Sequence, residues 1–217
     1  MHSIVGGPDT NLSIRPNDAV QCIAEYNRSS YRGMSNTALD QKAYRLFRDG
    51  ISSDPGRLVA QIAFVGEKYG GAQERFGSIR KEAEIIASNL RPILDKWQKF
   101  VMEAEPLSHE VPNQETLDFL FLPFVGTKHW PVWASKMLHF IKPDVFPILD
   151  SNAKKTLGLR HLVNSSRNYQ YFCSVFRQVP LENRESLAVA RSADRGESPT
   201  DLKLLDKVLF QLGVRMN

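Results

Sequence analysis

The sequence is poor in cysteine, in long apolar runs and in strand signals, and each shortage excludes a class of protein. Two cysteines among 217 residues cannot supply the four thiolates of an iron–sulfur cluster or of an all-cysteine zinc site. No stretch approaches the roughly 18 consecutive apolar residues of a membrane span. The N-terminus lacks a basic region followed by an apolar one, so we expect no secretory signal, no membrane partner and a cytoplasmic location.

The histidines and cysteines do not form a recognisable metal-binding pattern. None of the five histidines belongs to a His-Glu-x-x-His or His-x-His pair. Cys22 and Cys173 are far apart in the sequence and outside any Cys-x-x-Cys pair, which is typical of reduced thiols packed in a core. We therefore expect no metal site and two core cysteines.

Apolar periodicity predicts an all-α protein without a substantial sheet. Hydrophobic residues make up 42% of the chain and charged residues 24%, which is ordinary for a globular protein. Alternation of apolar and polar residues never persists, whereas spacings of three and four recur. With no linker or repeat visible, we expect a single helical domain over residues 1–217, with helices at 16–26, 36–49, 55–69, 78–102, 115–122, 131–141, 151–157 and 199–212.

Capping residues and prolines set the predicted helix ends. Pro92 should kink the long helix over 78–102. Short polar side chains before the apolar stripes are expected N-caps: Ser35 or Asn36, Asp54, Asp150 and Ser198.

Positive charge is concentrated in one part of the chain. The protein has a formal net charge of +4 and a pI near 9.1. Residues 128–177 contain eight Lys and Arg residues but two Asp, so this segment exceeds the whole chain in positive charge. Such an excess favours contacts with a phosphate backbone. The alternative, equally consistent with charge alone, is a solvated basic face that binds nothing.

Residues 119–152 carry the candidate chemistry. We expect a helix, a short turn, a second helix, a Pro-bounded extended loop and a third helix that begins after Asp150. Free amides and the helix dipole at that N-terminus favour the ionised form of a carboxylate. Pro143 and Pro147 restrict the backbone before it, so a rigid turn presents the acid. The alternative reading is that Asp150 is simply a helix cap.

This segment resembles the helix-hairpin-helix DNA glycosylase superfamily, and most closely its 8-oxoguanine DNA glycosylase branch. The family's hairpin reads approximately LPGVGTK, and residues 122–128 of this chain are Leu-Pro-Phe-Val-Gly-Thr-Lys. An alanine-containing helix follows, here with Ala134, and then a proline step into an aspartate, here Pro147 and Asp150. The resemblance covers about residues 115–159, a fifth of the chain.

The resemblance implies an enzyme that excises damaged or modified bases from double-stranded DNA, with lysine-dependent abasic-site lyase activity. Asp150 matches the aspartate that stabilises positive charge on the deoxyribose. Lys128 matches the nucleophilic lysine, and Lys136 is its rival because residues 129–133 look like an insertion of about one helical turn. We expect a monomer. One alternative is a catalytically inactive DNA-binding or interaction protein on the same scaffold; another is a different helical fold with a coincidental likeness.

Other residues around the hairpin are candidate DNA contacts. Five are expected to contact the DNA backbone, the first two through their amides: Gly126, Thr127, His139, Lys154 and Lys155. Three aromatic residues are candidates for stacking on the everted base or wedging the duplex: Phe124, Trp130 and Trp133. For the aromatic residues the alternative is a place in the core, and for His139 it is a hydrogen bond to a loop carbonyl.

The hairpin departs from the family pattern at one position. Phe124 stands where the family has its first glycine, and because a bulky residue tolerates positive φ poorly, we expect a turn of different geometry. The resemblance also implies a monovalent cation held by main-chain carbonyls of the hairpin, and no other cofactor or metal.

Overall fold

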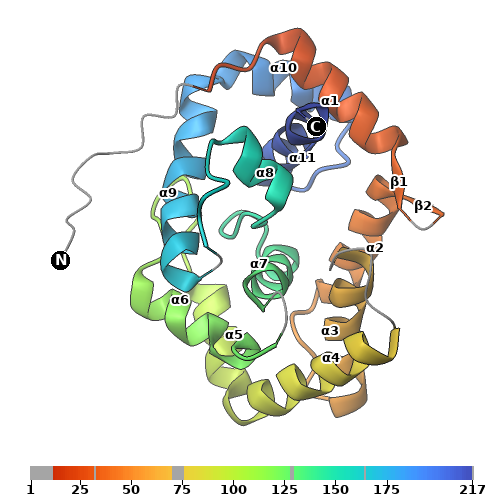
Figure 1. Cartoon of the computed structure of the whole chain (residues 1–217), viewed down its shortest axis with the longest axis vertical. Helices are drawn as coiled ribbons and strands as arrows, with labels where there is room; N and C mark the ends of the chain where they lie inside the picture. Colours follow the sequence, from red (N-terminus) through yellow and green to blue (C-terminus); the bar gives the residue numbers. More distant parts are fainter. Residues whose placement is uncertain (1–11, 32, 70–75, 128–129, 164, 217) are drawn as a thin grey trace.

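The protein is all-α, which confirms the fold class predicted from the sequence. The structure, a computed structural model, describes residues 12–31, 33–69, 76–127, 130–163 and 165–216 (Figure 1). Most of these residues are helical, and the strands among them are limited to β1 (Ser30–Tyr31) and β2 (Met34–Ser35), which form one short antiparallel pair.

The helices follow one another through short connections. In chain order they are α1 (Pro16–Arg28), α2 (Asn36–Phe47), α3 (Pro55–Tyr69), α4 (Phe76–Leu90), α5 (Leu94–Glu103), α6 (Gln114–Phe121), α7 (Trp130–Ile141), α8 (Ser151–Thr156), α9 (Ser166–Glu182), α10 (Arg184–Asp194) and α11 (Asp201–Arg215). Two 3₁₀ turns, η1 (Arg91–Ile93) and η2 (Leu122–Phe124), follow α4 and α6.

Local sequence signals place several helix ends correctly. The predicted long helix is interrupted at Pro92, where η1 separates α4 from α5. Ser35 caps α2 by accepting a hydrogen bond from the amide of Ala38 at 3.2 Å. Asp54 accepts a hydrogen bond from the amide of Arg57 at 2.8 Å, as expected for a cap of α3.

The C-terminal third of the fold departs from the prediction. Helices α9 and α10 have no counterpart among the predicted helices, and Pro180, a helix-breaking residue, lies inside α9. The cap predicted at Ser198 is wrong, because the hydroxyl of Thr200 caps α11 through the amide of Lys203. The amide of Ser198 instead donates to the carboxylate of Asp194 at 2.7 Å.

Helix α7 lies in the middle of the fold. Figure 1 shows it near the centre of a ring of helices, and it packs against α2, α3 and α6. Its apolar side chains join a hydrophobic cluster that extends from the start of α1 to α11. Cys22 and Cys173 are both fully buried in that cluster, which confirms their predicted place in the core.

Helices α8 and α11 approach each other unusually closely. The hydroxyl of Thr156 donates to the carbonyl of Leu209 at 2.8 Å. A Cβ placed on Gly213 would lie 2.3 Å from the carbonyl oxygen of Asn152, so only glycine fits there without movement of the backbone. This contact fixes the position of the first turn of α8, which begins directly after Asp150.

We predict that Gly213→Ala destabilises the protein by about 2 kcal/mol, because the overlap with backbone outweighs the helix propensity that alanine adds. Denaturation by urea, followed by circular dichroism, measures the change. Gly56→Ala is the matched control in a helix, since its Cβ would lie 3.4 Å from Asp54 Oδ1, an ordinary contact. Equal stability of the two variants would contradict the close approach of α8 and α11.

Candidate functional site

The extended loop between α7 and α8 leads to Asp150 and is held by hydrogen bonds along its length. Its prolines restrict the backbone as predicted. Hydrogen bonds from several helices and loops also hold it in place. These bonds join Leu107 N to Asp144 O at 2.9 Å, Thr200 Oγ1 to Pro143 O at 3.2 Å, Tyr169 OH to Pro147 O at 2.7 Å, and Leu149 N to Ser135 Oγ at 3.1 Å.

His139 is part of this support and is not a DNA contact. Its ring is fully buried, with Nδ1 2.7 Å from the carbonyl of Phe146 and Nε2 2.8 Å from the hydroxyl of Tyr44. Since a carbonyl can only accept, Nδ1 carries the proton and Nε2 accepts from Tyr44. Burial, reinforced by the positive charge of Lys203, lowers the pKa of His139 to about 3. A neutral, buried ring that bonds a loop carbonyl replaces the predicted phosphate contact.

Asp150 ends the loop as the N-cap of α8. Its Oδ1 accepts hydrogen bonds from the amides of Asn152 at 2.6 Å and Ala153 at 3.1 Å. Burial raises the pKa of this carboxyl group, while the amine of Lys136 and the two amides act in the opposite direction. The predicted cap is confirmed, but burial makes the carboxylate harder to ionise than the helix N-terminus alone would suggest.

Lys136 is the candidate nucleophile that the structure describes, and its charge interacts with that of Asp150. It lies in the middle of α7, and its side chain is only 7% exposed. Burial lowers the pKa of the Lys136 amine, and the strongest opposing influence is the negative charge of Asp150. The charges of the two groups therefore influence each other. Lys128, the other candidate nucleophile, lies outside the described residues.

Further charged side chains are buried next to this pair. The Nζ of Lys203, on α11, lies 3.1 Å from Asp40 and 3.0 Å from Asp206, and all three side chains are almost inaccessible to solvent. Burial alone would lower the pKa of Lys203, but Asp40, Tyr26 and Asp206 raise it well above its usual value. On the same helix, Lys207 pairs with Asp194 at 2.8 Å. We call the buried Asp40, Lys136, Lys203 and Asp206, together with the partly buried Asp150, the charge cluster.

The turn between α6 and α7 has a different geometry from a glycine hairpin, as predicted. Phe124 lies in the 3₁₀ turn η2, and the positive φ of 91° falls instead on the exposed Gly126. Thr127 donates both its amide, at 3.2 Å, and its hydroxyl, at 2.8 Å, to the carbonyl of Phe124. The amide of Thr127 is thus already used inside the turn, so its predicted phosphate contact is wrong. The predicted phosphate contact of the Gly126 amide stays a prediction. The monovalent cation also stays a prediction.

The described aromatic candidates belong to the core. Phe124 is fully buried and Trp133 is 2% exposed, so neither reaches a duplex from its place in the structure. Trp133 packs directly over Gly66 of α3, where an added Cβ would lie 2.3 Å from the indole ring. The predicted wedge and stacking roles of Phe124 and Trp133 are wrong, because apolar rings next to the turn fill the α3–α7 contact and the core. The side chain of Trp130 lies outside the described part of the chain.

The basic segment is largely used inside the protein. Lys142 donates to the carbonyls of Met102 and Ala104 around the C-terminus of α5, at 2.6 Å and 2.5 Å. Lys154 donates to the carbonyl of Leu162 at 3.1 Å, and Arg177 bonds two loop carbonyls. Lys155 is only 6% exposed, so little of its side chain is open to a phosphate, and its predicted contact stays a prediction.

The predicted contact of the half-buried Lys154 with the DNA backbone stays a prediction. Its pKa is lowered by burial, against the charge of Asp150. Among the described Lys and Arg residues of segment 128–177, Arg160 and Arg167 are exposed, and the structure describes no hydrogen bond from their side chains to the rest of the protein.

Sequence reasoning missed the polar groups that position the site. Ser135, Tyr44 and Tyr169 support the loop, while Asp206 and Lys203 extend the charge cluster. The available signal was on α11, where Lys203, Asp206 and Lys207 are spaced at i, i+3 and i+4 among apolar residues. That spacing places charges on one helical face, but it does not show that the face is buried.

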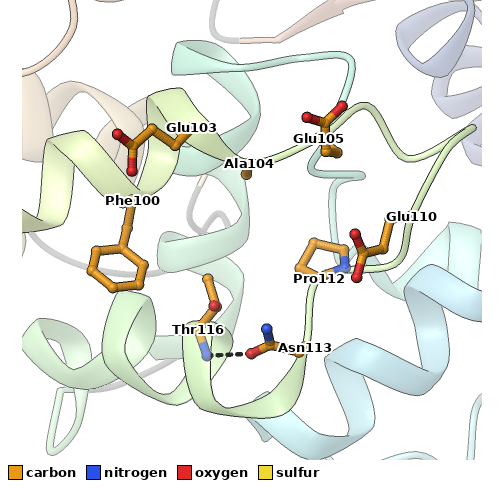
Figure 2. Close-up of a pocket in the computed structure, with 8 residues that line it drawn as sticks. All are labelled: Phe100, Glu103, Ala104, Glu105, Glu110, Pro112, Asn113 and Thr116. Carbon is orange, nitrogen blue, oxygen red and sulfur yellow. Dashed lines mark hydrogen bonds between the residues drawn. The ribbon is translucent and has the colours of Figure 1, made fainter.

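A separate pocket of about 260 Å³ lies between the end of α5 and the start of α6 (Figure 2). Its lining is acidic and would repel phosphate. The lining residues are Phe100, Glu103, Ala104, Glu105, Glu110, Pro112, Asn113 and Thr116. The side chain of Asn113 is already used there as the cap of α6, through the amide of Thr116 at 2.9 Å.

We predict that His139→Asn flattens the dependence of stability on pH. The folded pKa of about 3 lies below the unfolded value of 6.5, so the unfolded state binds more protons in between. Stability is therefore lost as pH falls below 6.5, by about 1.4 kcal/mol per pH unit. Asparagine keeps a donor for the carbonyl of Phe146 but does not titrate.

Free energies of unfolding at several pH values below 6.5 test this prediction. His161→Asn is the control, because His161 is exposed and should leave the slope unchanged. A wild-type slope retained in His139→Asn would contradict the neutral, buried state of His139.

The described residues add neither a metal site nor a membrane span. Among them, no group of three or more His, Cys, Asp or Glu side chains is placed to hold a metal ion, and no helix has the length and apolarity needed to cross a bilayer. No protein-family description, curated protein or solved structure matches the chain. The resemblance to the DNA glycosylases therefore stays a prediction.

Proposed function

We propose that this protein is a DNA glycosylase-type enzyme that removes damaged or modified bases, with Lys136 as its amine nucleophile and Asp150 as its electrostatic stabiliser. The single observation that carries the proposal is the hydrogen bond of 3.1 Å from Leu149 N to Ser135 Oγ, which ties the loop before Asp150 to the turn of α7 that carries Lys136 and lets the two charges interact. The helix-hairpin-helix resemblance of residues 115–159 supplies the substrate class.

The environment of Lys136 suits an amine nucleophile. An amine must lose its proton before it can attack carbon, and burial favours the neutral form of Lys136. Lys128 remains the alternative nucleophile from the hairpin. The supported loop before α8 holds the partner carboxylate in one place, which such chemistry requires.

Asp150 suits the second role. Breaking the bond between base and deoxyribose builds positive charge on the sugar, and an ionised carboxylate nearby stabilises it. The neutral amine of Lys136 then bonds to C1′ as the base departs with the electron pair of the broken bond. The amine nitrogen loses a proton to the departing base, and the C1′–O4′ bond then breaks, with O4′ taking up a proton, to leave an imine between Lys136 and C1′. Loss of a proton from C2′ then eliminates the 3′ phosphate, which nicks the strand. The target base has to leave the duplex first, at a cost of a few kcal/mol that is smallest for damaged bases.

Borohydride trapping tests the lysine. With duplexes that contain 8-oxoguanine or an abasic site, we predict a covalent protein–DNA complex that is lost in Lys136→Gln, because glutamine cannot form an imine. Lys81→Gln, at an exposed position on α4, is the control and should trap like the wild type. Loss of trapping in Lys128→Gln alone would move the nucleophile to the hairpin. Trapping that survives both substitutions would remove the lysine mechanism.

Asp150→Asn tests the carboxylate. Asparagine caps a helix about as well as aspartate, so the free energy of unfolding should change by no more than about 1 kcal/mol. Base release, measured in single-turnover assays, should fall by about 100-fold or more because the charge is lost. A variant that unfolds would show that the position is structural first, and a folded variant that excises normally would show that Asp150 is a cap without a catalytic role.

The low exposure of Lys136 favours a second candidate, a DNA-binding protein on the same scaffold without catalysis. At 7% exposed, the amine is accessible to a nucleotide only if neighbouring side chains move. This candidate requires salt-sensitive affinity for duplex DNA with no base release on any lesion. Gel-shift and base-release assays on the same duplexes distinguish the two, and absence of binding at low salt would contradict both.

A further inference from the structure

The loop between α8 and α9 displays side chains that the protein does not use internally. Arg160 and Val163 lie in this loop, and Arg167 follows in the first turn of α9. All three side chains are exposed, and Val163, at 73%, is the most exposed large apolar side chain among the described residues. The structure describes no hydrogen bond from either of these guanidinium groups to the rest of the protein, in contrast to Arg177.

The backbone of this loop is fixed by local hydrogen bonds. Gly158 turns the chain out of α8 with a positive φ of 70°. The amides of Gly158 and Leu159 donate to the carbonyls of Lys155 and Lys154 at 3.1 Å and 2.7 Å, which is the Schellman pattern of a helix end. The carbonyl of the buried Leu159 accepts from the amide of Leu162 at 3.0 Å. A loop held in this way has little conformational freedom to lose when it binds a partner.

Side chains from both helices hold the exposed part of the loop. The amine of Lys154 donates to the carbonyl of Leu162 at 3.1 Å, and the side-chain amide of Asn168 donates to the carbonyl of Val163 at 2.6 Å. Lys154 lies one helical turn after Asp150, since its backbone amide donates to the carbonyl of Asp150 at 2.9 Å. The loop is therefore anchored to the turn of α8 that begins at the half-buried carboxylate of the proposed site.

The charge in this part of the sequence has one sign. Residues 151–181 contain five Lys and Arg residues and no Asp or Glu. Asp118, from α6, meets the start of α9, where it accepts the hydroxyl hydrogen of Ser166 at 2.5 Å, and it also accepts from Gln114 at 2.6 Å. Exposed cations in such a segment favour a polyanion, and duplex DNA carries one negative charge per about 1.7 Å of its axis.

We propose that the α8–α9 loop binds duplex DNA, with Arg160 and Arg167 on backbone phosphates and Val163 inserted into the base stack at the gap that an everted base leaves. An apolar side chain in that gap offsets the lost stacking, as in proteins that wedge a duplex open. Phe124 and Trp133 are buried and cannot fill this role, whereas Val163 is exposed between two exposed cations. The inference rests on the proposed function for its substrate, double-stranded DNA with a damaged or modified base.

The first test removes the two cations. Arg160→Gln combined with Arg167→Gln should raise the Kd for duplex DNA by about ten-fold at low salt, and it should make the slope of log K against log salt shallower by about two, because each phosphate contact contributes about one. Fluorescence anisotropy at several salt concentrations measures both quantities. Arg160→Lys combined with Arg167→Lys keeps the charges and should retain the slope.

Matched controls come from the other side of the fold. Arg45→Gln combined with Arg57→Gln removes two exposed cations from α2 and α3, which lie across α7 from α9 in Figure 1, and should leave the slope unchanged. The wild type gives an answer that needs no variant. Bound duplex should protect Arg160 and Arg167 from modification by phenylglyoxal, read by mass spectrometry, and Arg45 and Arg57 should react equally with and without DNA.

The second test concerns the apolar side chain. In a duplex with 2-aminopurine beside 8-oxoguanine, unstacking raises the 2-aminopurine fluorescence at saturating protein. Val163→Ser should reduce that rise by about two-fold or more without changing the salt slope, because serine does not replace the lost stacking. Val189→Ser, at an exposed position on α10, is the control and should give the wild-type rise. A wild-type rise in Val163→Ser would overturn the insertion of this side chain.

The outcomes separate this inference from the proposed enzyme. A wild-type salt slope in the double Gln variant, or unprotected Arg160 and Arg167 in the bound wild type, would overturn the DNA-binding loop, while base release by the same protein would still support the enzyme. Loop variants that weaken DNA binding by a protein that releases no base would support the loop and overturn the enzyme. A wild type that does not bind duplex DNA at low salt would overturn both.

Discussion

Burial of the Lys136 amine beside carboxylates is the constraint on which this part of the fold depends. An isolated charge inside a protein is too costly to persist, so it is either neutralised or matched by opposite charges. The negative charges of Asp150 and Asp206 oppose the effect of burial on Lys136, and Lys203 on α11 is held by Asp40 from α2 at 3.1 Å. Because this ion pair requires close geometry, it fixes α11 against α2.

Other polar side chains of α7 are also buried and therefore need partners inside the protein. Ser135 and His139 bind backbone groups of the loop that precedes α8, and Tyr44 supplies the remaining partner of the histidine. Burial of these groups is tolerated because each has a partner. The loop before Asp150 is thus held by hydrogen bonds along its length, although it has no regular structure of its own.

Prediction from the sequence succeeded for local features and failed for exposure. The kink at Pro92 and the caps at Ser35 and Asp150 depend on neighbours within four residues, so the sequence contains all the information needed. For Phe124 and Trp133 the sequence left open a DNA contact or a place in the core, and the structure confirms the core, where the packing of α3 against α7 buries the tryptophan. The positive charge of residues 128–177 was counted correctly, but the sequence did not show that much of it is used inside the protein. Lys142, for example, donates to carbonyls around the C-terminus of α5.

The sequence by itself determined the all-α class, the turn between α6 and α7 and the aspartate at the start of α8, because helical periodicity and capping are properties of short segments. Only the tertiary structure decided that Lys136 and Asp150 interact through their charges and that Lys203 and Asp206 form a buried ion pair. These residues are up to 70 positions apart in the chain. Charges meet across such distances only after helices pack, and the protonation of each depends on the burial that packing creates.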